Sequence, residues 1–422
     1  MKLAVVGGGW AGLAAAVRAC EAGHAVTLFE MAAQAGGRAR RVDVDGLALD
    51  NGQHILVGAY RRTLDLMRTV GADAATLLLR RPLELRYADG RGLRMPPGPA
   101  GIGFVRAVAG CRGWTAAERL ALLRAAAGWA LTGFRCAPQL TAAELCRRLP
   151  PAVRELLIDP LCVAALNTPA HEASAAVLLR VLRDAVFGGR GAADLLLPRQ
   201  SLASVLPEPA TRWLRAAGAE LRLRTRVQRL QRDGGGWRVD GATFDAVVLA
   251  CPAAEAARLA ADAAPDWARQ AAALHYEPIV TVYLRCPGAR LPAPMTALHE
   301  GADAPAQFAF DHGAIGATPG LFAFVVSGAR RWVDAGLDTA GAAVLQQART
   351  AFAPGTWPTP PTVLRVLADK RATFRCTPGL RRPPAQVAGR LAAAGDYVDG
   401  PYPATLEGAV RAGEAAAAIV AA

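Results

Sequence analysis

The chain has 422 residues, which is too long for one simple core, so two domains are expected. It is 53% hydrophobic and 20% charged, and 48 basic residues against 35 acidic ones give a formal net charge of +13. No basic block with interleaved aromatic residues occurs, which disfavours nucleic acid as a partner. No uncharged apolar run reaches about 18 residues, the length at which a membrane-spanning helix is expected. A basic surface is nevertheless suited to anionic membranes or acidic ligands.

The eight cysteines are scattered along the chain without a C-x-x-C pair. This spacing argues against a metal site or a disulfide framework and favours a reducing, cytoplasmic compartment. The apolar N-terminus superficially resembles a signal peptide, but four glycines interrupt it within the six positions 7–12. We therefore expect a different role for this segment.

The first thirty residues form a nucleotide-binding pattern. Residues 2–6 (KLAVV) are typical of a buried parallel strand, and the glycine-rich turn GGGWAG follows at residues 7–12. A helix then ends at Gly23, and a second strand, AVTLFE, ends in Glu30. This order of strand, G-x-G-x-x-G turn, helix, strand and acid predicts a Rossmann-like dinucleotide site.

Each position of this fingerprint has an expected task. The first glycine makes the turn, the second lets the backbone approach a pyrophosphate, and the third lets helix and strand pack closely. The helix N-terminus adds partial positive charge, and the acid accepts from both ribose hydroxyls. Because that acid would repel a 2′-phosphate, NADP is disfavoured. The expected contacts are Gly7, Gly9, Trp10, Ala11, Gly12 and Glu30.

A second glycine pair follows the fingerprint. Gly36 and Gly37 again permit close approach of the backbone, and Arg38 can fork onto phosphate oxygens. An ordinary loop with a solvated arginine is the alternative interpretation.

The C-terminal stretch favours FAD over NAD. A small apolar strand leads to Gly395 and Asp396, and the Asp396 carboxylate can accept from a ribityl hydroxyl. A helix expected to begin near Thr405 and Leu406 can aim its dipole at the N1–C2=O edge of a flavin, which stabilises the reduced ring. An NAD enzyme has no need of this second, distant element.

Several longer stretches narrow the family. They are "GGRARR", "LDNGQHILVGAYRRTL", "DPLCVAALNTP" (159–169), "DKRATFRCTPG" (369–379) and "GDYVDGPYPATLEGAVRAG". Together they resemble the squalene-associated FAD-dependent desaturases of the flavin amine oxidase and carotenoid desaturase superfamily, over most of the chain. The resemblance implies a Rossmann-like FAD domain of the GR2 or amine-oxidase type with an inserted α+β substrate domain. It also implies reductive dehydroxylation of hydroxysqualene, in bacterial squalene and hopanoid biosynthesis.

Two positions depart from the superfamily pattern. Arg40 stands where Ser or Thr often follows the Gly-Gly-Arg motif. In the expected strand "EPIVTVYL" (277–284), Thr281 occupies the place at which many amine oxidases carry a lysine near the flavin N5. This second departure counts against amine oxidation.

The FAD domain is expected to be discontinuous, built from residues 1–65, 198–257 and 385–422, with residues 66–197 and 258–384 forming the substrate domain. In the second segment, the resemblance implies that the backbone at Val227 meets the adenine. Residues 100–190 are predicted to be mostly helical, with T-x-x-E capping boxes at Thr115 and Thr141. Residues 258–384 are predicted to form strands with long loops.

The stretch DNGQHILVGAY (50–60) has two interpretations. In the superfamily the strand after Gly-Gly-Arg ends beside the isoalloxazine ring, which implies that Gly52 passes the flavin while Gln53 and His54 lie near the reaction. Alternatively, Asp50 starts a turn and His54 is a satisfied core histidine. The sequence leaves both open.

The hypothetical reaction begins with an allylic alcohol. Departure of its hydroxyl leaves a delocalised cation, which hydride from reduced FAD quenches, and an acid must protonate the leaving oxygen. The candidate donors are His54, Lys370 and Tyr402, in that order. The alternatives are a polyene desaturase and a non-catalytic flavin-bearing lipid-binding protein. No second nucleotide fingerprint occurs, so the electron donor is expected to be external and is not identified.

The isoprenoid substrate suggests contact with a membrane surface. Phe104, Trp114, Trp129 and Phe134 lie among arginines and could form an interfacial entrance. Aromatic residues at this spacing are also typical of a core.

Overall fold

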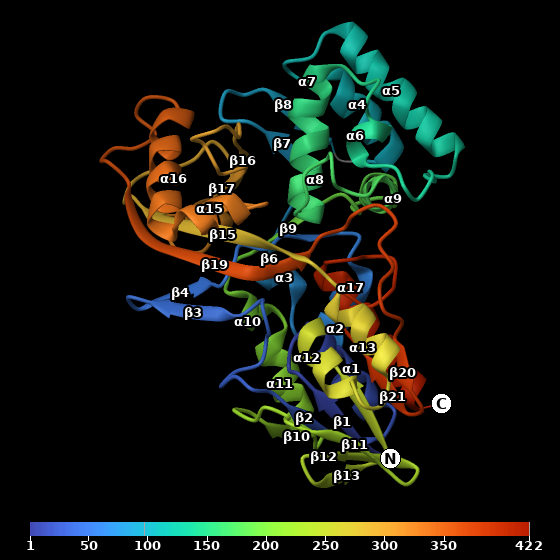
Figure 1. Cartoon of the computed structure of the whole chain (residues 1–422). Coiled ribbons are helices and arrows are strands. Elements are labelled where there is room, and N and C mark those ends of the chain that lie inside the picture. Colours follow the sequence, from blue (N-terminus) through green and yellow to red (C-terminus); the bar gives the residue numbers. More distant parts are fainter. Residues whose placement is uncertain (97, 422) are drawn as a thin grey trace.

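The computed structural model describes residues 1–96 and 98–421. Two large sheets organise the chain. A mainly parallel sheet occupies the lower half of Figure 1, near both chain termini, and an antiparallel sheet lies in the upper half beside a group of helices. The predicted α/β class, with a Rossmann-like part assembled from discontinuous segments, is confirmed. The domain boundaries stay a prediction.

The parallel sheet has the strand order β10–β2–β1–β14–β21–β20, and every pair is parallel except β20–β21. Its central strands are short apolar runs because layers of helix and sheet cover both faces. Three separated parts of the sequence therefore build one sheet. The strands are β1 (Lys2–Val6), β2 (Ala25–Phe29), β10 (Glu220–Arg222), β14 (Ala246–Leu249), β20 (Gln386–Ala388) and β21 (Leu391–Ala393).

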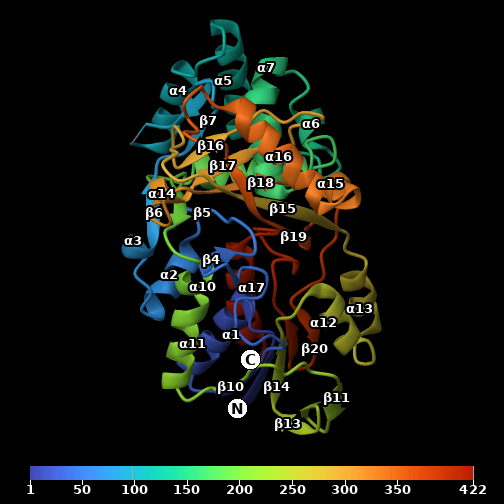
Figure 2. The same cartoon turned by 90° about the vertical axis from the view of Figure 1, so that its left-hand side faces the viewer.

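The first and last helices of the chain lie side by side against this sheet, α1 (Trp10–Glu21) and α17 (Leu406–Ala421) (Figures 1 and 2). Their backbones touch, since a Cβ added to Gly413 would lie 2.1 Å from the carbonyl oxygen of Ala11. The surrounding elements are α11 (Pro207–Ala216), the small sheet of β11 (Leu230–Asp233), β12 (Gly236–Val239) and β13 (Ala242–Phe244), and the helices α12 (Ala253–Ala260) and α13 (Pro265–Ala272).

The antiparallel sheet has the order β16–β17–β18–β15–β19. Its longest strands, β15 and β19, pair along their length with a large bulge near the start of β15. The strands are β15 (Tyr276–Arg285), β16 (Met295–Ala297), β17 (Phe308–Asp311), β18 (Leu321–Val326) and β19 (Thr362–Phe374). The helices beside them are α14 (His312–Ile315), α15 (Arg330–Ala335) and α16 (Leu337–Ala351).

The expected helical insertion is confirmed, and both capping boxes are present, Thr115 with Glu118 and Thr141 with Glu144. Its α-helices are α4 (Ala100–Ala109), α5 (Ala116–Leu131), α6 (Ala142–Leu145), α7 (Pro151–Val153), α8 (Asp159–Leu166) and α9 (Ala175–Val181). Two π-helical turns continue α7 and α9, η1 (Arg154–Ile158) and η2 (Leu182–Val186).

Short elements connect these parts. The strands β3 (Arg41–Val44) and β4 (Leu47–Asp50) form a hairpin, as do β7 (Glu84–Arg86) and β8 (Gly92–Arg94). A three-stranded sheet contains β5 (Leu56–Val57), β9 (Leu195–Pro198) and β6 (Leu78–Arg81). The remaining helices are α2 (Arg61–Thr69), α3 (Ala74–Leu77) and α10 (Leu202–Val205).

One prediction of local structure is corrected. Residues 258–384 are not only strands and loops, because α16 spans 15 residues there and buries Ala340, Val344 and Ala348 at helical spacing. Within residues 50–60, only Leu56 and Val57 are a strand after β4 ends at Asp50. In the described part of the chain, no helix has the length and apolar character needed to cross a membrane.

Candidate functional site at the flavin-binding segments

The glycine fingerprint has a geometric reason at two of its positions. Gly7 has φ of +110°, and a Cβ there would lie 2.5 Å from the carbonyl oxygen of Ala250 on the neighbouring strand end. A Cβ on Gly12 would lie 1.8 Å from the carbonyl oxygen of Gly7. The predicted tasks of the turn glycine and the packing glycine are therefore met by backbone contacts.

Gly9 differs from its two neighbours in the motif. Among the described residues, a Cβ added there would meet only the Cα of Gly37, at an ordinary contact distance of 3.8 Å. The protein itself therefore tolerates a side chain at this position. The predicted approach of a pyrophosphate supplies the missing reason for glycine, and the first residues of α1 at Trp10 and Ala11 lie at the same turn. Trp10 also buries an Nε1–H that has no partner in the described residues.

Glu30 lies at the end of β2, as predicted. Its carboxylate is buried, and its two oxygens accept from the backbone amides of Gly8 and Ala32, each at 2.7 Å. Each carboxylate oxygen has a second lone pair. The carboxylate is thus held in place by the backbone and can still accept from ribose hydroxyls.

Arg38 and Asp396 meet although 358 positions separate them. Arg38 Nη2 donates to Asp396 Oδ1 at 2.5 Å, and Nη1 donates to the carbonyl oxygen of Ala372 at 2.6 Å. Burial alone would lower the pKa of Arg38, but the Asp396 carboxylate outweighs it and the pKa is raised. This pair joins the second glycine motif, next to Gly37, to the C-terminal strand end after Gly395.

Ala372 reaches Arg38 because β19 bulges there. Glu277 pairs with Thr373, whereas Ile279 pairs with Asp369, so three residues of β19 stand opposite one residue of β15. Bulges of this kind re-aim backbone groups near functional sites. The motif "DKRATFRCTPG" thus supplies a backbone acceptor that sequence reasoning did not identify.

The last helix begins where the sequence predicted. Thr405 Oγ1 accepts from the amide of Gly408 at 2.9 Å, and α17 starts at Leu406. The buried carboxylate of Glu407 accepts from the amide and hydroxyl of Thr63, both at 2.9 Å, at the start of α2. The N-terminus of α17 is therefore fixed to the first segment of the chain.

Val227 is buried, as expected for a residue beneath an adenine. Its carbonyl oxygen accepts from Arg258 Nη2 at 2.8 Å, and Arg258 also binds the carbonyl oxygen of Gln228 at 2.7 Å. Contact of Val227 with an adenine stays a prediction.

Residues from three segments gather around Gly52. A Cβ added to Gly52 would lie 3.7 Å from His54 Cε1 and 3.9 Å from Thr281 Oγ1 on β15. Arg38 and Asp369 also lie near enough to change the pKa of His54, which Arg38 lowers and Asp369 raises. The hydroxyl of Thr281 and the side-chain oxygen of Gln53 are buried without a partner in the described residues. Buried polar atoms without partners are costly, so they favour a ligand here.

His54 is neutral at neutral pH. Its burial lowers the pKa, which the bond to Gly52 only partly offsets. His54 Nδ1 lies 2.6 Å from the carbonyl oxygen of Gly52, which can only accept, so Nδ1 carries the proton. The other ring nitrogen, Nε2, is then an acceptor. This tautomer weighs against His54 as the resident acid.

Asp50 is a second buried titratable group beside Gly52. Its Oδ1 accepts from the amide of Leu202 at 2.8 Å, which fixes the start of α10, and its carbonyl oxygen accepts from Tyr283 Oη at 3.0 Å. Burial raises the pKa of Asp50 to about 7. Asp50 therefore holds a proton for part of the time at neutral pH, and it serves a helix start rather than the predicted turn.

The two other predicted donors have different surroundings. The side chain of Lys370 is exposed, whereas the neighbouring residue Asp369 lies near enough to His54 to raise its pKa. Tyr402 is half-buried, and Arg411 lies 4.8 Å from its ring centre. Burial, and then the neighbouring Asp184, raise the pKa of Tyr402. The structure brings His54, Gln53 and Gly52 together, and it places Tyr402 at the start of α17.

Asn167 gives the motif "PLCVAALNTP" a structural role. It ends α8 with φ of +47° and is buried. Its Nδ2 donates to the carbonyl oxygen of Glu277 and to Thr373 Oγ1, at 3.1 and 3.0 Å, and its Oδ1 accepts from Gly328 at 2.7 Å. One side chain therefore ties the helical insertion to both long strands of the antiparallel sheet.

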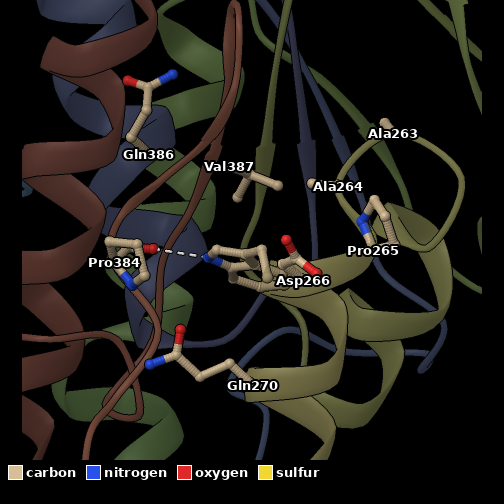
Figure 3. A pocket seen from close by; sticks show the side chains of 9 residues that line it. Ala263, Ala264, Pro265, Asp266, Gln270, Pro384, Gln386 and Val387 are labelled. Atoms are coloured by element: carbon tan, nitrogen blue, oxygen red, sulfur yellow. Dashed lines mark hydrogen bonds between the residues drawn. The ribbon is translucent and has the colours of Figure 1, made fainter.

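A surface hollow of about 450 Å³ lies between the start of α13 and residues 384–387 (Figure 3). Trp267 forms one wall, and its Nε1 donates to the carbonyl oxygen of Pro384 at 2.9 Å. None of the predicted site residues lines it.

The family comparison agrees with this geometry, because the family described as flavin containing amine oxidoreductase matches residues 10–421. The chain belongs to that family. Hydroxysqualene dehydroxylase of Rhodopseudomonas palustris is 31% identical over 440 residues, covering 99% of this chain and 97% of that protein. The protein of the same name from Zymomonas mobilis is 28% identical and covers 98% and 97%.

Other proteins are similar in part of the sequence or in fold. Zeta-carotene desaturase of Synechocystis is 42% identical over 73 residues, 17% of this chain and 15% of that protein. The solved structure of an oxidoreductase from Methanosarcina mazei matches with a TM-score of 0.74 at 18% identity, covering 98% and 99%. The protein is therefore an FAD-dependent oxidoreductase. The unexplained glycine at position 9 and the unpartnered polar atoms of Trp10, Gln53 and Thr281 fit such a cofactor.

Proposed function

We propose that the protein removes the hydroxyl group of hydroxysqualene to give squalene, as a step of bacterial squalene and hopanoid biosynthesis. The observation that carries this proposal is the similarity to hydroxysqualene dehydroxylases over nearly the whole chain, including the stretches around Gly52 and Asn167. Thr281 supports it, because it stands on β15 beside Gly52, where the amine-oxidase lysine is expected.

The proposed reaction needs a hydride, a proton and a dry pocket. Reduced FAD, when bound, supplies the hydride. The carbon–oxygen bond breaks to give an allylic cation and, with one proton, water, and a new carbon–hydrogen bond then completes squalene. Water must be kept from the cation. The buried surroundings of Gly52 and Thr281 suit that requirement.

Neutral His54 is suited to orientation of the substrate. Its Nε2 accepts a hydrogen bond, and the hydroxyl of an allylic alcohol is a matching donor. The proton for the leaving oxygen must come from a group that holds one at neutral pH. Tyr402, whose pKa is raised, and Asp50, whose pKa is about 7, meet this condition. Lys370 remains a candidate only if its exposed side chain turns inward.

The reaction is tested by anaerobic incubation of photoreduced protein with hydroxysqualene. Formation of squalene together with reoxidation of the flavin is the expected result. Oxidation of an added polyene by the oxidised protein would instead support a desaturase. Failure to form product in either direction would leave a flavin-bearing lipid-binding protein.

His54 is tested with His54→Gln and His54→Ala at matched FAD occupancy. Because an orienting acceptor contributes a factor of about 10 to 100, His54→Ala should lose that much in kcat/KM. His54→Gln, which keeps a neutral acceptor, should recover part of the loss. Its kcat/KM should change little with pH. Normal turnover of His54→Ala would remove this residue from the mechanism.

A desaturase acting on a carotenoid or squalene-type chain is the second candidate. The 73-residue similarity to zeta-carotene desaturase favours it. Because FAD can accept or deliver hydride, the anaerobic assay above separates the two directions.

A further inference from the structure

The aromatic residues expected at a membrane entrance face the core instead. Phe104 and Trp114 are buried, and the Phe187 ring lies 5.4 Å from Phe104 and 5.2 Å from Phe134. The alternative interpretation of these residues as core is therefore confirmed for Phe104 and Trp114.

The solvent-facing side of α4 and α5 carries aliphatic side chains as well as arginines. Four large apolar side chains on α4 and α5 remain in solvent, with exposed fractions of 54% for Ile102, 50% for Val105, 45% for Leu120 and 89% for Leu131. We call the surface that carries these four residues the hairpin face. On α5, the positions between Leu120 and Leu131 on this side include exposed Ala127 and Gly128. Exposed Arg124 lies on the same side of α5, so this side combines apolar and basic side chains. A group of exposed large apolar side chains of this kind indicates a covering partner.

The charges around the hairpin face have one sign. Residues 100–135 contain five arginines and one acid, Glu118. Glu118 is bound within the capping box of α5, where it accepts from Thr115. Arg106, Arg112 and Arg124 are exposed. Aliphatic side chains surrounded by arginines match the interface of an anionic bilayer, since the chains enter the acyl boundary and the guanidinium groups meet phosphates.

A hollow of about 470 Å³ opens at the start of α4. Its walls are glycines, Pro99, Ala100, Phe187 and Arg190. Phe187 directly follows η2, whose Asp184 acts on Tyr402 at the start of α17. The hollow thus adjoins the first residues of α4, and its Phe187 wall directly follows the turn whose Asp184 lies near Tyr402. Figures 1 and 2 show α4 and α5 together at the rim farthest from the chain termini.

We propose that the hairpin face docks on an anionic phospholipid bilayer and that the hollow at the start of α4 receives an isoprenoid chain from it. Uptake of the chain rests on the proposed function, whereas docking does not. The two steps can therefore be tested separately.

Docking is tested by flotation with vesicles of phosphatidylcholine, with and without phosphatidylglycerol. The wild-type holoprotein should float with the anionic vesicles and less with the neutral ones, and about 0.5 M salt should weaken the binding. The variant Ile102→Ser/Val105→Ser/Leu120→Ser/Leu131→Ser should lose about tenfold or more in vesicle affinity.

The matched control is Val363→Ser/Leu380→Ser, which removes two exposed apolar side chains elsewhere. It should float like the wild type, and all three proteins should melt alike with equal FAD content. A wild type that does not float, or a fourfold variant that floats equally well, would overturn the proposal. Sedimentation without lipid tests a second copy as the occupant. A wild-type dimer that the fourfold variant abolishes, without vesicle binding, would also overturn it.

Uptake is tested by turnover of hydroxysqualene in vesicles and in detergent. The fourfold variant should show about a tenfold higher KM for substrate in vesicles, with kcat and the detergent assay unchanged. Equal KM values of the fourfold variant and the wild type in vesicles would refute uptake at this face. If the wild type turns over neither form, the proposed function fails while flotation still decides docking.

Discussion

At the nucleotide end of the flavin site, backbone contacts fix the geometry, whereas at the reacting end distant side chains meet. Gly7 and Gly12 fit against carbonyl groups of neighbouring strand ends, and both oxygens of Glu30 have backbone partners. Around Gly52, in contrast, Thr281 keeps a buried hydroxyl without a partner in the described residues. The nucleotide end is therefore fixed mainly by backbone contacts, whereas the reacting end carries buried polar side chains without a partner in the described residues.

Because of this difference, substitutions in the two regions should affect different properties of the protein. A change to Gly7 or Gly12 should mainly alter folding, because these two glycines fit against backbone groups of the protein. A change among the buried polar groups of the reacting end should alter the pH dependence of stability or the binding of ligands. Four substitutions test this division, in order of decreasing predicted effect.

Gly12→Ala should have the largest effect. Its Cβ would lie 1.8 Å from the Gly7 carbonyl oxygen, so α1 and β1 cannot keep their packing. We expect the free energy of unfolding to fall by roughly 4 kcal/mol or more, or the variant not to fold at all. Gly235→Ala is the control, since nothing lies within 4 Å of its Cβ. Thermal melting compares the two, and a Gly12→Ala variant as stable as the control would contradict the packing described.

Asp50→Asn should stabilise the protein at high pH. The folded protein holds the Asp50 proton up to about pH 7, whereas an ordinary aspartate releases it near 3.8, so wild-type stability falls as the pH rises between these values. Asparagine keeps an acceptor for Leu202 and cannot ionise. We expect a gain of roughly 2 to 4 kcal/mol at about pH 8 that disappears near pH 4.

Denaturant unfolding at several pH values measures this effect. Asp43→Asn on the neighbouring exposed strand is the control and should give no such trend. A pH-independent difference for Asp50→Asn would show that burial does not hold its proton.

Asn167→Gly should destabilise the protein by roughly 2 to 3 kcal/mol, because it removes three buried hydrogen bonds while keeping the left-handed backbone. Asn167→Ala should lose about 1 kcal/mol more, since alanine disfavours φ of +47°. Unfolding in urea checks both. Equal stability of Asn167→Gly and the wild type would mean that the insertion is held by apolar packing alone.

Arg38→Lys should have the smallest effect on folding and a measurable one on the cofactor. Lysine keeps the charge beside Asp396, but it lacks the planar guanidinium group whose two nitrogens donate to Asp396 and to the Ala372 carbonyl oxygen at once. We expect FAD affinity to fall about tenfold, with little change in the melting temperature. Arg40→Lys, two residues away and exposed, should bind FAD like the wild type.

Local patterns in the sequence predicted much of the nucleotide end. The G-x-G-x-x-G turn, the acid after β2 and the helix start at Thr405 each depend on neighbouring residues, and all three are found in the structure. The strand that carries Thr281 was also predicted from its apolar run.

The reacting end was less predictable because it depends on strand register and burial. The bulge of β19 moves Ala372 onto Arg38, and no local signal reveals such a register shift. The tautomer of His54 depends on the Gly52 carbonyl oxygen and on its surroundings. Asn167, a polar residue at the end of an apolar run, was the one available signal for the contact between insertion and sheet.

We propose that both ends of the chain bind one FAD, with the second glycine of the fingerprint at its pyrophosphate. Titration of FAD into wild-type and Gly9→Ala apoprotein tests it most directly, because only Gly37, at 3.8 Å, lies near the added Cβ. We predict one FAD per wild-type chain, and for Gly9→Ala an unchanged apoprotein melting temperature with affinity lowered about a hundredfold. A Gly9→Ala protein that binds FAD as tightly as the wild type would contradict this account.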